Sequence, residues 1–480
     1  MIASPFVMVI FGATGDLAKS KLIPGLFSLY QQNKLPKDFF IVGFARREFS
    51  DEEFRNMFEK LVGQEEWNKF SRHIFYQQGV FEEEAGYKTL IKKLEAYDDK
   101  MNACIMRIFY LATPPANYED ILDKLAFTKL SEGCGQGSNK WTRIAIEKPF
   151  GKDLETARHL DKKLADIFDE KQIFRVDHYL GKETVQNMIA FRFANSIFDP
   201  VWNKDYIDHV QITLSEEKGI GSRGKFFEGV GMLRDVGQNH LLQLAASVVM
   251  EQPKSFTKDG VRDARAAAMA ALRCYEKKEV LENVVRSQYE GYKGEKDVAK
   301  DSRTETFVAM KVFFDTKRFS QVPFYLRFGK KLETDFTEIS IVFKQTCHIL
   351  FKEYGCPEVG NILRIRIQPN EGISLRVIAK KPGDTVSLGT VNMEFSYYEE
   401  FGGHGGDAYE KLLIDIFAGD QMLFNRSDEL DHSWEFITKV LKVWQEQNKS
   451  KKFTIPNYKQ RTQGSKEAFT LIEKDSRKWL

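Results

Sequence analysis

Phe6-Val-Met-Val-Ile-Phe11-Gly12-Ala-Thr-Gly15-Asp-Leu-Ala18 is the stretch that decides the fold expected for this chain of 480 residues. Phe6 to Phe11 is a continuous apolar run, which is typical of a parallel strand buried on both faces. The glycines that follow stand where a helix should begin, and there the backbone can approach a pyrophosphate. The stretch therefore predicts a dinucleotide-binding turn, although its GxxG spacing and Ala18 depart from the usual GxGxxG.

Short apolar runs alternate with amphipathic stretches through the rest of the first 200 or so residues. The runs are Phe39 to Phe44, Ile105 to Leu111 and Arg143 to Ile146, and the helical candidates are Tyr118 to Leu130 and Asp153 to Asp169. Such alternation predicts βαβ units in a doubly wound, Rossmann-like α/β domain. We take the segment EKPFG, residues 147–151, as the end of its last strand, where ligands of open α/β sheets bind.

After about residue 205 the pattern changes to longer strands, several of which alternate apolar and polar residues. The strand candidates are His209 to Leu214, Phe307 to Phe314, Ile339 to Phe343 and Ile362 to Gln368, interrupted by helical stretches around 232–250 and 261–272. This texture predicts an α+β domain with a large, mainly antiparallel sheet. The chain is thus divided into residues 1–180 and residues 181–480, with solvated loops expected at 131–139 and 290–303.

Composition excludes several classes of protein. The 71 basic and 69 acidic side chains give a net charge of +2, so nothing attracts the whole chain to nucleic acid. No apolar stretch of about 20 residues is present, and no basic segment precedes the first apolar run, so neither a membrane span nor a signal peptide is expected. The five cysteines form no CxxC pair, and we expect reduced thiols in a cytoplasmic protein, without a disulfide framework or zinc site.

Two arginines follow the second predicted strand, in Val42-Gly-Phe-Ala45-Arg46-Arg47. An NAD-selective site usually places a carboxylate at that tip to hold the ribose hydroxyls, whereas a guanidinium suits a 2′-phosphate. The sequence therefore favours NADP over NAD, the alternative being two solvated surface arginines. Glu48 follows closely, so some use of NAD stays open.

The segment Arg175-Val-Asp177-His178-Tyr179-Leu-Gly-Lys182-Glu183 is the most informative part of the chain. If a helix begins near Tyr179, then His178, Tyr179 and Lys182 gather at its first turn as phosphate ligands. The alternative is an ordinary helix start held by salt bridges. Asp177 cannot serve an anion there, so its carboxylate needs a cationic or imidazole partner.

His240 is the candidate partner, within Leu233-Arg-Asp235-Val-Gly-Gln-Asn239-His240-Leu241. A lone histidine in such an apolar stretch is more often a core residue than a base. A carboxylate partner changes this, because it fixes the imidazole tautomer and leaves the second nitrogen as an acceptor. An Asp177–His240 dyad can remove a hydroxyl proton while hydride leaves the same carbon. Lys148 of EKPFG can reach both a nicotinamide and a sugar, unless it is a solvent-facing loop lysine.

Taken together, these motifs resemble the glucose-6-phosphate dehydrogenase family. The segments that carry the resemblance occur in the family's order from residue 12 to about 430: GATGDLAKSKL, LATPP, EKPFG, RVDHYLGKE, RGKFFEGVGMLRDVGQNHLLQ, RFGKKL, RIQPNE and DAYEKLLIDIFAGDQMLFNRSDEL. The resemblance implies oxidation of the C1 hydroxyl of glucose 6-phosphate to 6-phosphogluconolactone, the first step of the oxidative pentose phosphate pathway, with NADP and without a metal. It also implies a Rossmann domain and a second domain whose large sheet forms a dimer interface, in a homodimer or homotetramer.

The resemblance assigns a role to each matching position. His240 would be the general base and Asp177 its supporting carboxylate, with Lys148 between substrate and cofactor. The substrate would be held by His178, Tyr179, Lys182, Glu216, Asp235, Lys330 and Gln368. The cofactor would be held by Gly12, Thr14, Gly15, Asp16, Lys21, Arg46 and Lys148.

The chain departs from the family pattern in two places. Asp335 follows RFGKKL where many relatives have a basic residue, so substrate affinity is altered or another cation substitutes. Residues 399–407 are unusually rich in glycine, and whether one or two NADP molecules bind is left open.

Three other interpretations compete with this one. A different sugar oxidoreductase with an EKP turn is opposed by RVDHYLGKE and RDVGQNH together. An NADPH sensor without catalysis is opposed by the retained Asp177, Lys148 and His240, since a sensor needs no base. A scaffold whose clusters are ordinary salt bridges is the third.

Overall fold

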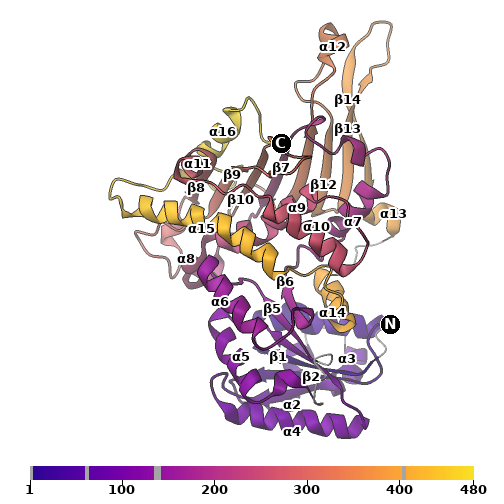
Figure 1. The fold of residues 1–480 in the computed structure, drawn as a ribbon, viewed down its shortest axis with the longest axis vertical. Helices are drawn as coiled ribbons and strands as arrows, with labels where there is room; N and C mark the ends of the chain where they lie inside the picture. Colours follow the sequence, from indigo (N-terminus) through magenta and orange to yellow (C-terminus); the bar gives the residue numbers. More distant parts are fainter. Residues whose placement is uncertain (1–3, 60–63, 134–141, 403–406) are drawn as a thin grey trace.

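The computed structural model describes residues 4–59, 64–133, 142–402 and 407–480. Two sheets organise them, as Figure 1 shows. The first has six parallel strands in the order β3-β2-β1-β4-β5-β6. Its strands are β1 (Phe6–Phe11), β2 (Phe39–Ala45), β3 (Ile74–Gln78), β4 (Met106–Leu111), β5 (Thr142–Glu147) and β6 (Ile173–Val176).

The apolar run at the start of the chain lies at the centre of this sheet. β1 pairs with β2 on one side and β4 on the other, and every residue from Phe6 to Phe11 is buried. Uniform burial explains why the run does not alternate in polarity. A Rossmann-like first domain, predicted from the sequence, is therefore confirmed.

Helices follow the strands of this sheet in alternation. Helices α4, α5 and α6 pack on one another in sequence, whereas α1 packs against α3 and α14, which comes from far along the chain. Their bounds, with that of α2, are α1 (Ile23–Gln31), α2 (Asp51–Glu59), α3 (Gln64–Phe70), α4 (Glu84–Met101), α5 (Tyr118–Phe127), α6 (Leu154–Ala165) and α14 (Ala408–Ala418).

The second sheet has nine strands in the order β14-β13-β12-β11-β7-β10-β9-β8-β15. All pairs are antiparallel except β7 with β10 and β8 with β15, which confirms the prediction of a large, mainly antiparallel sheet. The strands are β7 (Ile207–Ser215), β8 (Val284–Tyr289), β9 (Phe307–Val312), β10 (Phe324–Gly329), β11 (Phe336–Phe343), β12 (Ile362–Gln368), β13 (Gly372–Lys380), β14 (Leu388–Ser396) and β15 (Asn457–Tyr458).

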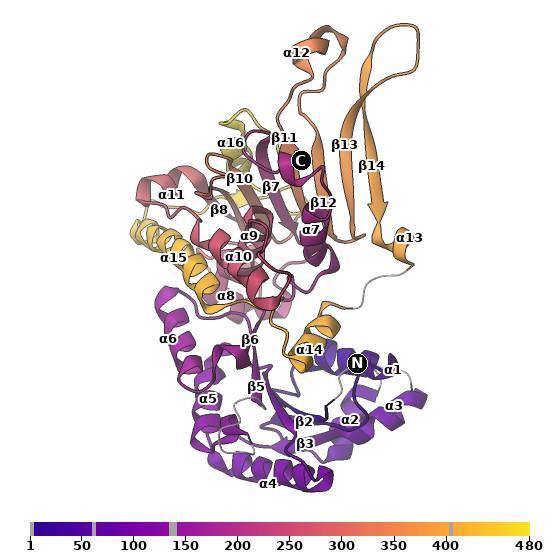
Figure 2. The same ribbon diagram turned by 45° about the vertical axis from the view of Figure 1, so that its right-hand side comes forward.

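Helices cover only part of this second sheet. Figure 2 shows α7, α9 and α10 in front of its centre, while β13, β14 and α12 project beyond the helices. The helices of this half are α7 (Glu183–Phe193), α8 (Gly224–Met232), α9 (Leu242–Val249), α10 (Lys258–Ala270), α11 (Lys277–Asn283), α12 (His348–Phe351), α13 (Tyr397–Phe401), α15 (Ser427–Lys449) and α16 (Lys466–Glu473). None of the helices in the described ranges is long and apolar enough to cross a membrane.

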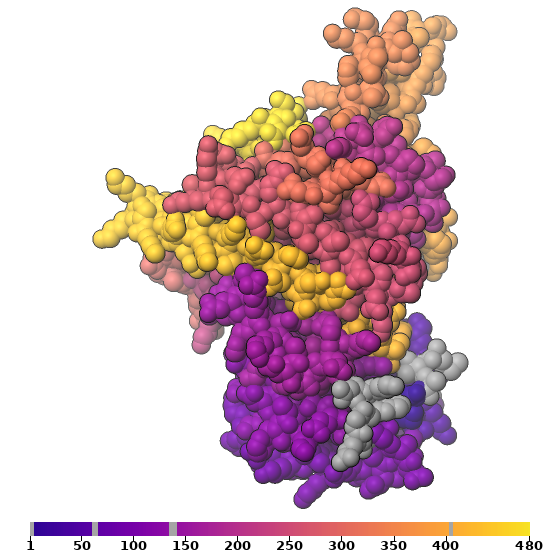
Figure 3. Space-filling model, viewed as in Figure 1, coloured from indigo at the N-terminus to yellow at the C-terminus, as the bar shows by residue number. Residues whose placement is uncertain are grey.

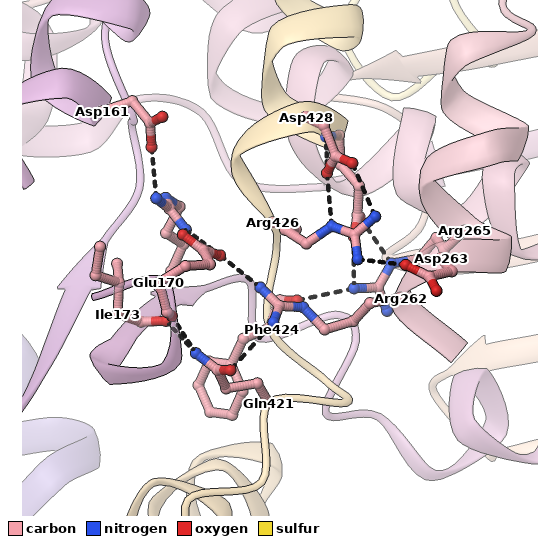
Figure 4. A network of polar contacts seen from close by, with 12 residues as sticks. Asp161, Glu170, Ile173, Arg262, Asp263, Arg265, Gln421, Phe424, Arg426 and Asp428 are labelled. Carbon is pink, nitrogen blue, oxygen red and sulfur yellow. Dashed lines mark hydrogen bonds and ion pairs between the residues drawn. The ribbon is translucent and has the colours of Figure 1, made fainter. Parts of the chain in front are cut away.

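Charged side chains join the two halves of the molecule. Arg175 of β6 bonds Asp161 and Glu170. Glu170 bonds in turn to Arg262 of α10, in the network that Figure 4 shows. On the surface, α6 and α15 lie side by side (Figure 3), where Arg158 pairs with an aspartate of α15. These contacts fix β6, and the residues just after it, against the second half.

The cysteine prediction was wrong. Cys347 and Cys356 form a disulfide on either side of α12, with their Cα atoms 5.9 Å apart. Cys104 is disulfide-bonded too, and Cys274 is the free cysteine among the described residues. The absence of CxxC did not exclude pairing, because a loop that folds back on itself can bring together cysteines nine positions apart.

Three segments expected from the sequence differ from the structure or lie partly outside the described residues. EKPFG does not end the last strand of the first sheet, because β6 pairs with β5 beyond it. β6 is only four residues long and includes Arg175, so it lacked a clear sequence signal. The loop expected at 290–303 contains only a short 3₁₀ turn, Tyr292–Gly294. The loop expected at 131–139 and the glycine-rich stretch at 399–407 lie partly outside the described residues.

Candidate active site

The candidate active site is assembled where the ends of β5 and β6 meet the π-helical segment η8 (Leu233–Leu241) of the second half. The carboxyl ends of parallel strands are where open α/β sheets bind ligands. Lys148 follows β5 and Asp177 follows β6, while η8 carries Asp235 and His240. Residues from three separate segments thus meet at one edge of the first sheet.

Asp177 and His240 form the expected dyad. His240 Nδ1 lies 2.5 Å from Asp177 Oδ1, and both side chains are buried. Burial raises the pKa of Asp177, but His240 and the other donors around it outweigh this and bring it down to about 2. Burial lowers the pKa of His240, against the opposing effect of Asp177. The imidazole is therefore neutral near pH 7, with Nδ1 bonded and Nε2 left to accept a proton.

The residues after Asp177 form turns, and the helix begins later than predicted. α7 starts at Glu183 with Lys182 at its N-cap, and successive turns link Asp177 to Leu180 and Tyr179 to Lys182. The reason is local, because the Asp177 carboxylate accepts the Tyr179 N–H and favours a turn over a helix. His178, Tyr179 and Lys182 nevertheless stay on one short segment beside the dyad.

Aromatic contacts order this segment around the base. The Tyr179 ring stacks on His240 with centroids 4.2 Å apart, and the His178 ring meets His240 edge-on at 4.7 Å. The Tyr179 hydroxyl contacts Thr337 Oγ1 at 3.2 Å and accepts a 3.4 Å bond from Gln368 Nε2. Gln368, at the end of β12, is therefore brought to the predicted place.

A chain of alternating charges forms the other wall. Lys148 Nζ donates to the Asp235 carbonyl at 2.5 Å and to its carboxylate at 3.2 Å. Buried Lys330 pairs with Glu216 and lies 3.8 Å from the far carboxylate oxygen of Asp235. Burial alone would raise the pKa of Asp235, but the two lysines hold it below its usual range. Lys148, Glu216, Asp235 and Lys330 thus present charged groups that can bond sugar hydroxyls.

Asp335 has a role in shaping this wall. Its carboxylate accepts the Glu217 N–H at 2.6 Å, next to Glu216. An arginine or lysine has no acceptor to make that bond. The residue that departs from the family pattern therefore holds the loop carrying Glu216.

Sequence reasoning missed a group of buried hydroxyls behind the site. Glu147 Oε1 accepts bonds from Tyr110 at 2.6 Å and Tyr409 at 3.2 Å. Burial raises the pKa of Glu147 to about 7, although the tyrosines and Lys148 oppose the shift. The Tyr409 ring also stacks beside His178 with centroids 6.0 Å apart. Tyr409 belongs to the DAYE segment, but nothing in the neighbouring sequence indicates that its hydroxyl reaches Glu147 or that its ring lies beside His178.

The nucleotide end of the site has the geometry expected of a phosphate turn. Gly12 has φ +82°, and a Cβ there would lie 2.6 Å from the Ala112 carbonyl oxygen. The Gly15 N–H bonds the Gly12 carbonyl, and the helical backbone starts directly afterwards, first as a π-helix at Ala18–Leu22. Thr14, Asp16 and Lys21 lie on this turn and the helix after it, none of them buried.

Arg46 and Arg47 are exposed just after β2, and neither forms an ion pair within the described ranges. Lys21 lies 2.6 Å from Asp407, at the N-cap of α14. The turn, its helix start and two free guanidinium groups fit a dinucleotide that carries a 2′-phosphate.

Ligand atoms of Asp177, His178 and His240 lie within 4.8 Å of one another, as in many metal sites. In this cluster, however, one imidazole nitrogen and one carboxylate oxygen already share a hydrogen bond. The arrangement is that of a hydrogen-bonded acid–base dyad.

Comparisons with known proteins agree with this geometry. The model of the glucose-6-phosphate dehydrogenase NAD-binding domain matches residues 9–187, and that of the C-terminal domain matches residues 189–480. Glucose-6-phosphate 1-dehydrogenase of Chlamydia pneumoniae is 42% identical, over 99% of this chain and 96% of its own length. That of Borreliella burgdorferi is 41% identical over 98% of both chains. A solved glucose-6-phosphate dehydrogenase in complex with glucose 6-phosphate superposes with a TM-score of 0.89 at 33% identity, covering 100% of this chain and 99% of the other.

Proposed function

Because the chain belongs to the glucose-6-phosphate dehydrogenase family, we infer that its site oxidises D-glucose 6-phosphate at C1 to 6-phospho-D-glucono-1,5-lactone, with NADP⁺ as hydride acceptor. This reaction is the first step of the oxidative pentose phosphate pathway. The observation that carries the inference is the buried Asp177–His240 hydrogen bond of 2.5 Å beside Lys148 and Lys330. A neutral imidazole held in one tautomer is the base that alcohol oxidation needs.

We propose the following roles in the chemical step. His240 Nε2 takes the proton of the C1 hydroxyl while the C1–H bond breaks and the C1–O double bond forms. When NADP⁺ is bound in the first domain, its nicotinamide would accept the hydride. Asp177 stabilises the imidazolium that forms on His240, which it can do because it is ionised and bonded to Nδ1. Lys148 bridges substrate and cofactor.

Two groups of residues would bind the substrate, one holding its phosphate and the other its sugar hydroxyls. We propose that His178, Tyr179 and Lys182 hold the phosphate, since the Lys182 ammonium has no ion-pair partner in the described part of the chain. Tyr409 lies beside His178 and belongs to the same set. The sugar hydroxyls are bonded by Glu216, Asp235, Lys330 and Gln368.

For the cofactor, Gly12, Thr14, Gly15 and Asp16 would line the diphosphate, with Lys21 nearby. Arg46 would hold the 2′-phosphate, because one guanidinium group can donate two parallel hydrogen bonds to phosphate oxygens. We assign the nucleotide domain to residues 1–180 and the substrate and dimerisation domain to residues 181–480.

We also propose a homodimer or a homotetramer. The support is the part of the second sheet left uncovered by helices, where β14 exposes Val391 and Met393. Exposed apolar side chains on a projecting strand pair commonly mark a protein interface. The substrate and cofactor are charged metabolites that membranes retain, which supports a cytoplasmic location.

Product analysis tests the assigned reaction. Incubation with glucose 6-phosphate and NADP⁺ should yield one NADPH for each lactone, trapped as its hydroxamate. A sugar phosphate oxidised at another carbon would contradict the assignment.

A further inference from the structure

The segment that carries Asp235 and His240 begins at a backbone break. Gly231 has φ +72° and ψ 169°, so α8 and η8 are not one continuous helix. The N–H groups that follow such a break have no carbonyl partners inside the new helix. Something outside the helix must accept them if η8 is to start at a fixed position.

Glu305, directly before β9, accepts two of these N–H groups. Its carbonyl oxygen bonds the Met232 N–H at 3.0 Å, and its carboxylate Oε1 bonds the Leu233 N–H at 3.0 Å. The side chain is only 5% exposed. A Cβ on Gly231 would lie 2.4 Å from the same oxygen, so the glycine leaves space for the carboxylate.

The same short segment also contacts the opposite wall of the site. The Thr306 carbonyl accepts the Lys330 N–H at 3.0 Å, and the Tyr458 hydroxyl contacts Thr306 Oγ1 and donates to the Lys330 carbonyl. Residues 305 and 306 therefore hold both η8 and Lys330.

Glu305 lines a cavity of about 180 Å³ together with Arg234 and Arg286. Burial raises the pKa of Glu305, while the Leu233 N–H, Arg234 and Arg286 oppose the shift. Arg303 and Glu228 also line the cavity. Neither Arg234 nor Arg286 lies within ion-pair distance of Glu305 in the described structure, so the direct contact of the carboxylate is the cap on Leu233.

We propose that Glu305 is a positioning residue for the oxidation: it caps the start of η8 and thereby keeps Asp235 and His240 aligned with Lys330 and Asp177. The inference rests on the proposed function. Glu305 does not touch the dyad, so it acts through the backbone of η8. The essential feature is an oxygen that can accept the Leu233 N–H, and an amide oxygen can do so as well as a carboxylate oxygen.

Two variants of Glu305 test the hydrogen bond to Leu233 separately from the negative charge. Glu305→Leu removes the accepting oxygen, whereas Glu305→Gln removes only the charge. Glu305→Leu should lower kcat for glucose 6-phosphate by about 10²-fold, the effect expected when catalytic groups shift by about 1 Å. The KM for NADP should stay the same. Glu305→Gln retains the accepting oxygen and should keep kcat within about threefold. If Glu305→Gln lost as much kcat as Glu305→Leu, the hydrogen bond to Leu233 could not be the cause and the proposal would be overturned.

The pH profile distinguishes positioning from a smaller folded fraction. The bond to Asp177 raises the pKa of His240, so displacing η8 and weakening that bond should lower this pKa. The acid limb of kcat/KM, and the His240 titration followed by NMR, should therefore move to lower pH in Glu305→Leu. Loss of folded enzyme alone changes neither. Glu228→Gln is the matched control, because Glu228 lines the same cavity but bonds Tyr292 and Ser302.

Wild-type turnover reports on the proposed function, independently of the variants. With an active wild type, unchanged kcat and pH profile in folded Glu305→Leu would overturn the role of Glu305 alone. The NMR titration applies even without turnover. If Glu305→Leu does not fold, Gly231→Ala approaches the contact from the other side. It should shift the His240 titration in the same direction, and an unshifted titration would overturn the proposal.

Discussion

At the scale of single residues, the chemistry of the site depends on how Asp177 and His240 act on each other. The two lie 63 positions apart, and one bond of 2.5 Å fixes both the tautomer and the charge of the pair. Each residue stood in a recognisable motif, so the pair could be predicted from sequence. Glu305 and Tyr409 could not, because their importance comes from contacts with distant segments.

His240→Asn should cut kcat by about 10²–10⁴-fold, since it removes a positioned general base. Substrate binding should remain largely intact, because the phosphate ligands are other residues. Steady-state kinetics with a direct binding measurement checks both. Unchanged turnover in this variant would exclude His240 as the base.

The acid limb of kcat/KM should report the protonation of His240. Burial lowers the pKa of this imidazole, so activity should persist below pH 6.5 and fall as the pH drops through the lowered value. Asp177→Asn removes a charge that raises this pKa, so the acid limb should move further down as kcat also falls. An acid limb that moved up instead would contradict the dyad.

Arg46→Ala should raise the KM for NADP much more than the KM for NAD, since only NADP has the 2′-phosphate. Arg72→Ala, at another exposed arginine, is the control and should change neither constant. Equal effects of Arg46→Ala on both cofactors would place the arginine away from the 2′-phosphate.

At the scale of elements, local pattern predicted the strands well and the helix starts poorly. β1 has the bounds of its apolar run, because six buried residues leave little choice. α7 starts four positions later than expected, because the Asp177 carboxylate bonds the backbone first. The π-helical winding of η8 had no sequence signal either.

Buried charge pairs between helices should contribute more to the stability of the molecule than exposed pairs do. Arg265 of α10 bonds Glu429 of α15 in a bidentate pair, and both side chains are buried. Arg265→Met leaves that carboxylate buried without its partner, which should cost about 3–5 kcal/mol of unfolding free energy. Arg158→Met breaks the exposed pair between α6 and Asp431 of α15, and it should cost much less because solvent screens exposed ion pairs. Urea unfolding compares the two, and equal losses would contradict the argument.

At the scale of the whole molecule, the change in sequence pattern near residue 205 predicted the two-part architecture but not how the two parts are held together. The charge network around Arg175, Glu170 and Arg262 joins segments that no local pattern relates. The disulfide of Cys347 and Cys356 had no composition signal either, because an odd cysteine count does not reveal which loops fold back.

Light scattering with size exclusion should give twice or four times the mass of the chain. Met393→Lys on β14 should favour the monomer, because it charges the uncovered strand pair. Phe256→Lys is the control, at an apolar side chain that is 74% exposed elsewhere on the surface. A monomeric wild type would contradict the proposed interface.

The central claim is that the dyad, the phosphate ligands and the arginine after β2 form one NADP-dependent sugar-phosphate site. The most direct test is the initial rate of nicotinamide reduction, measured with glucose 6-phosphate or glucose and with NADP⁺ or NAD⁺. We predict fast reduction of NADP⁺ with glucose 6-phosphate, slower reduction of NAD⁺, and none above background with glucose. Equal rates with glucose and its phosphate, or no reduction by folded protein, would contradict the claim.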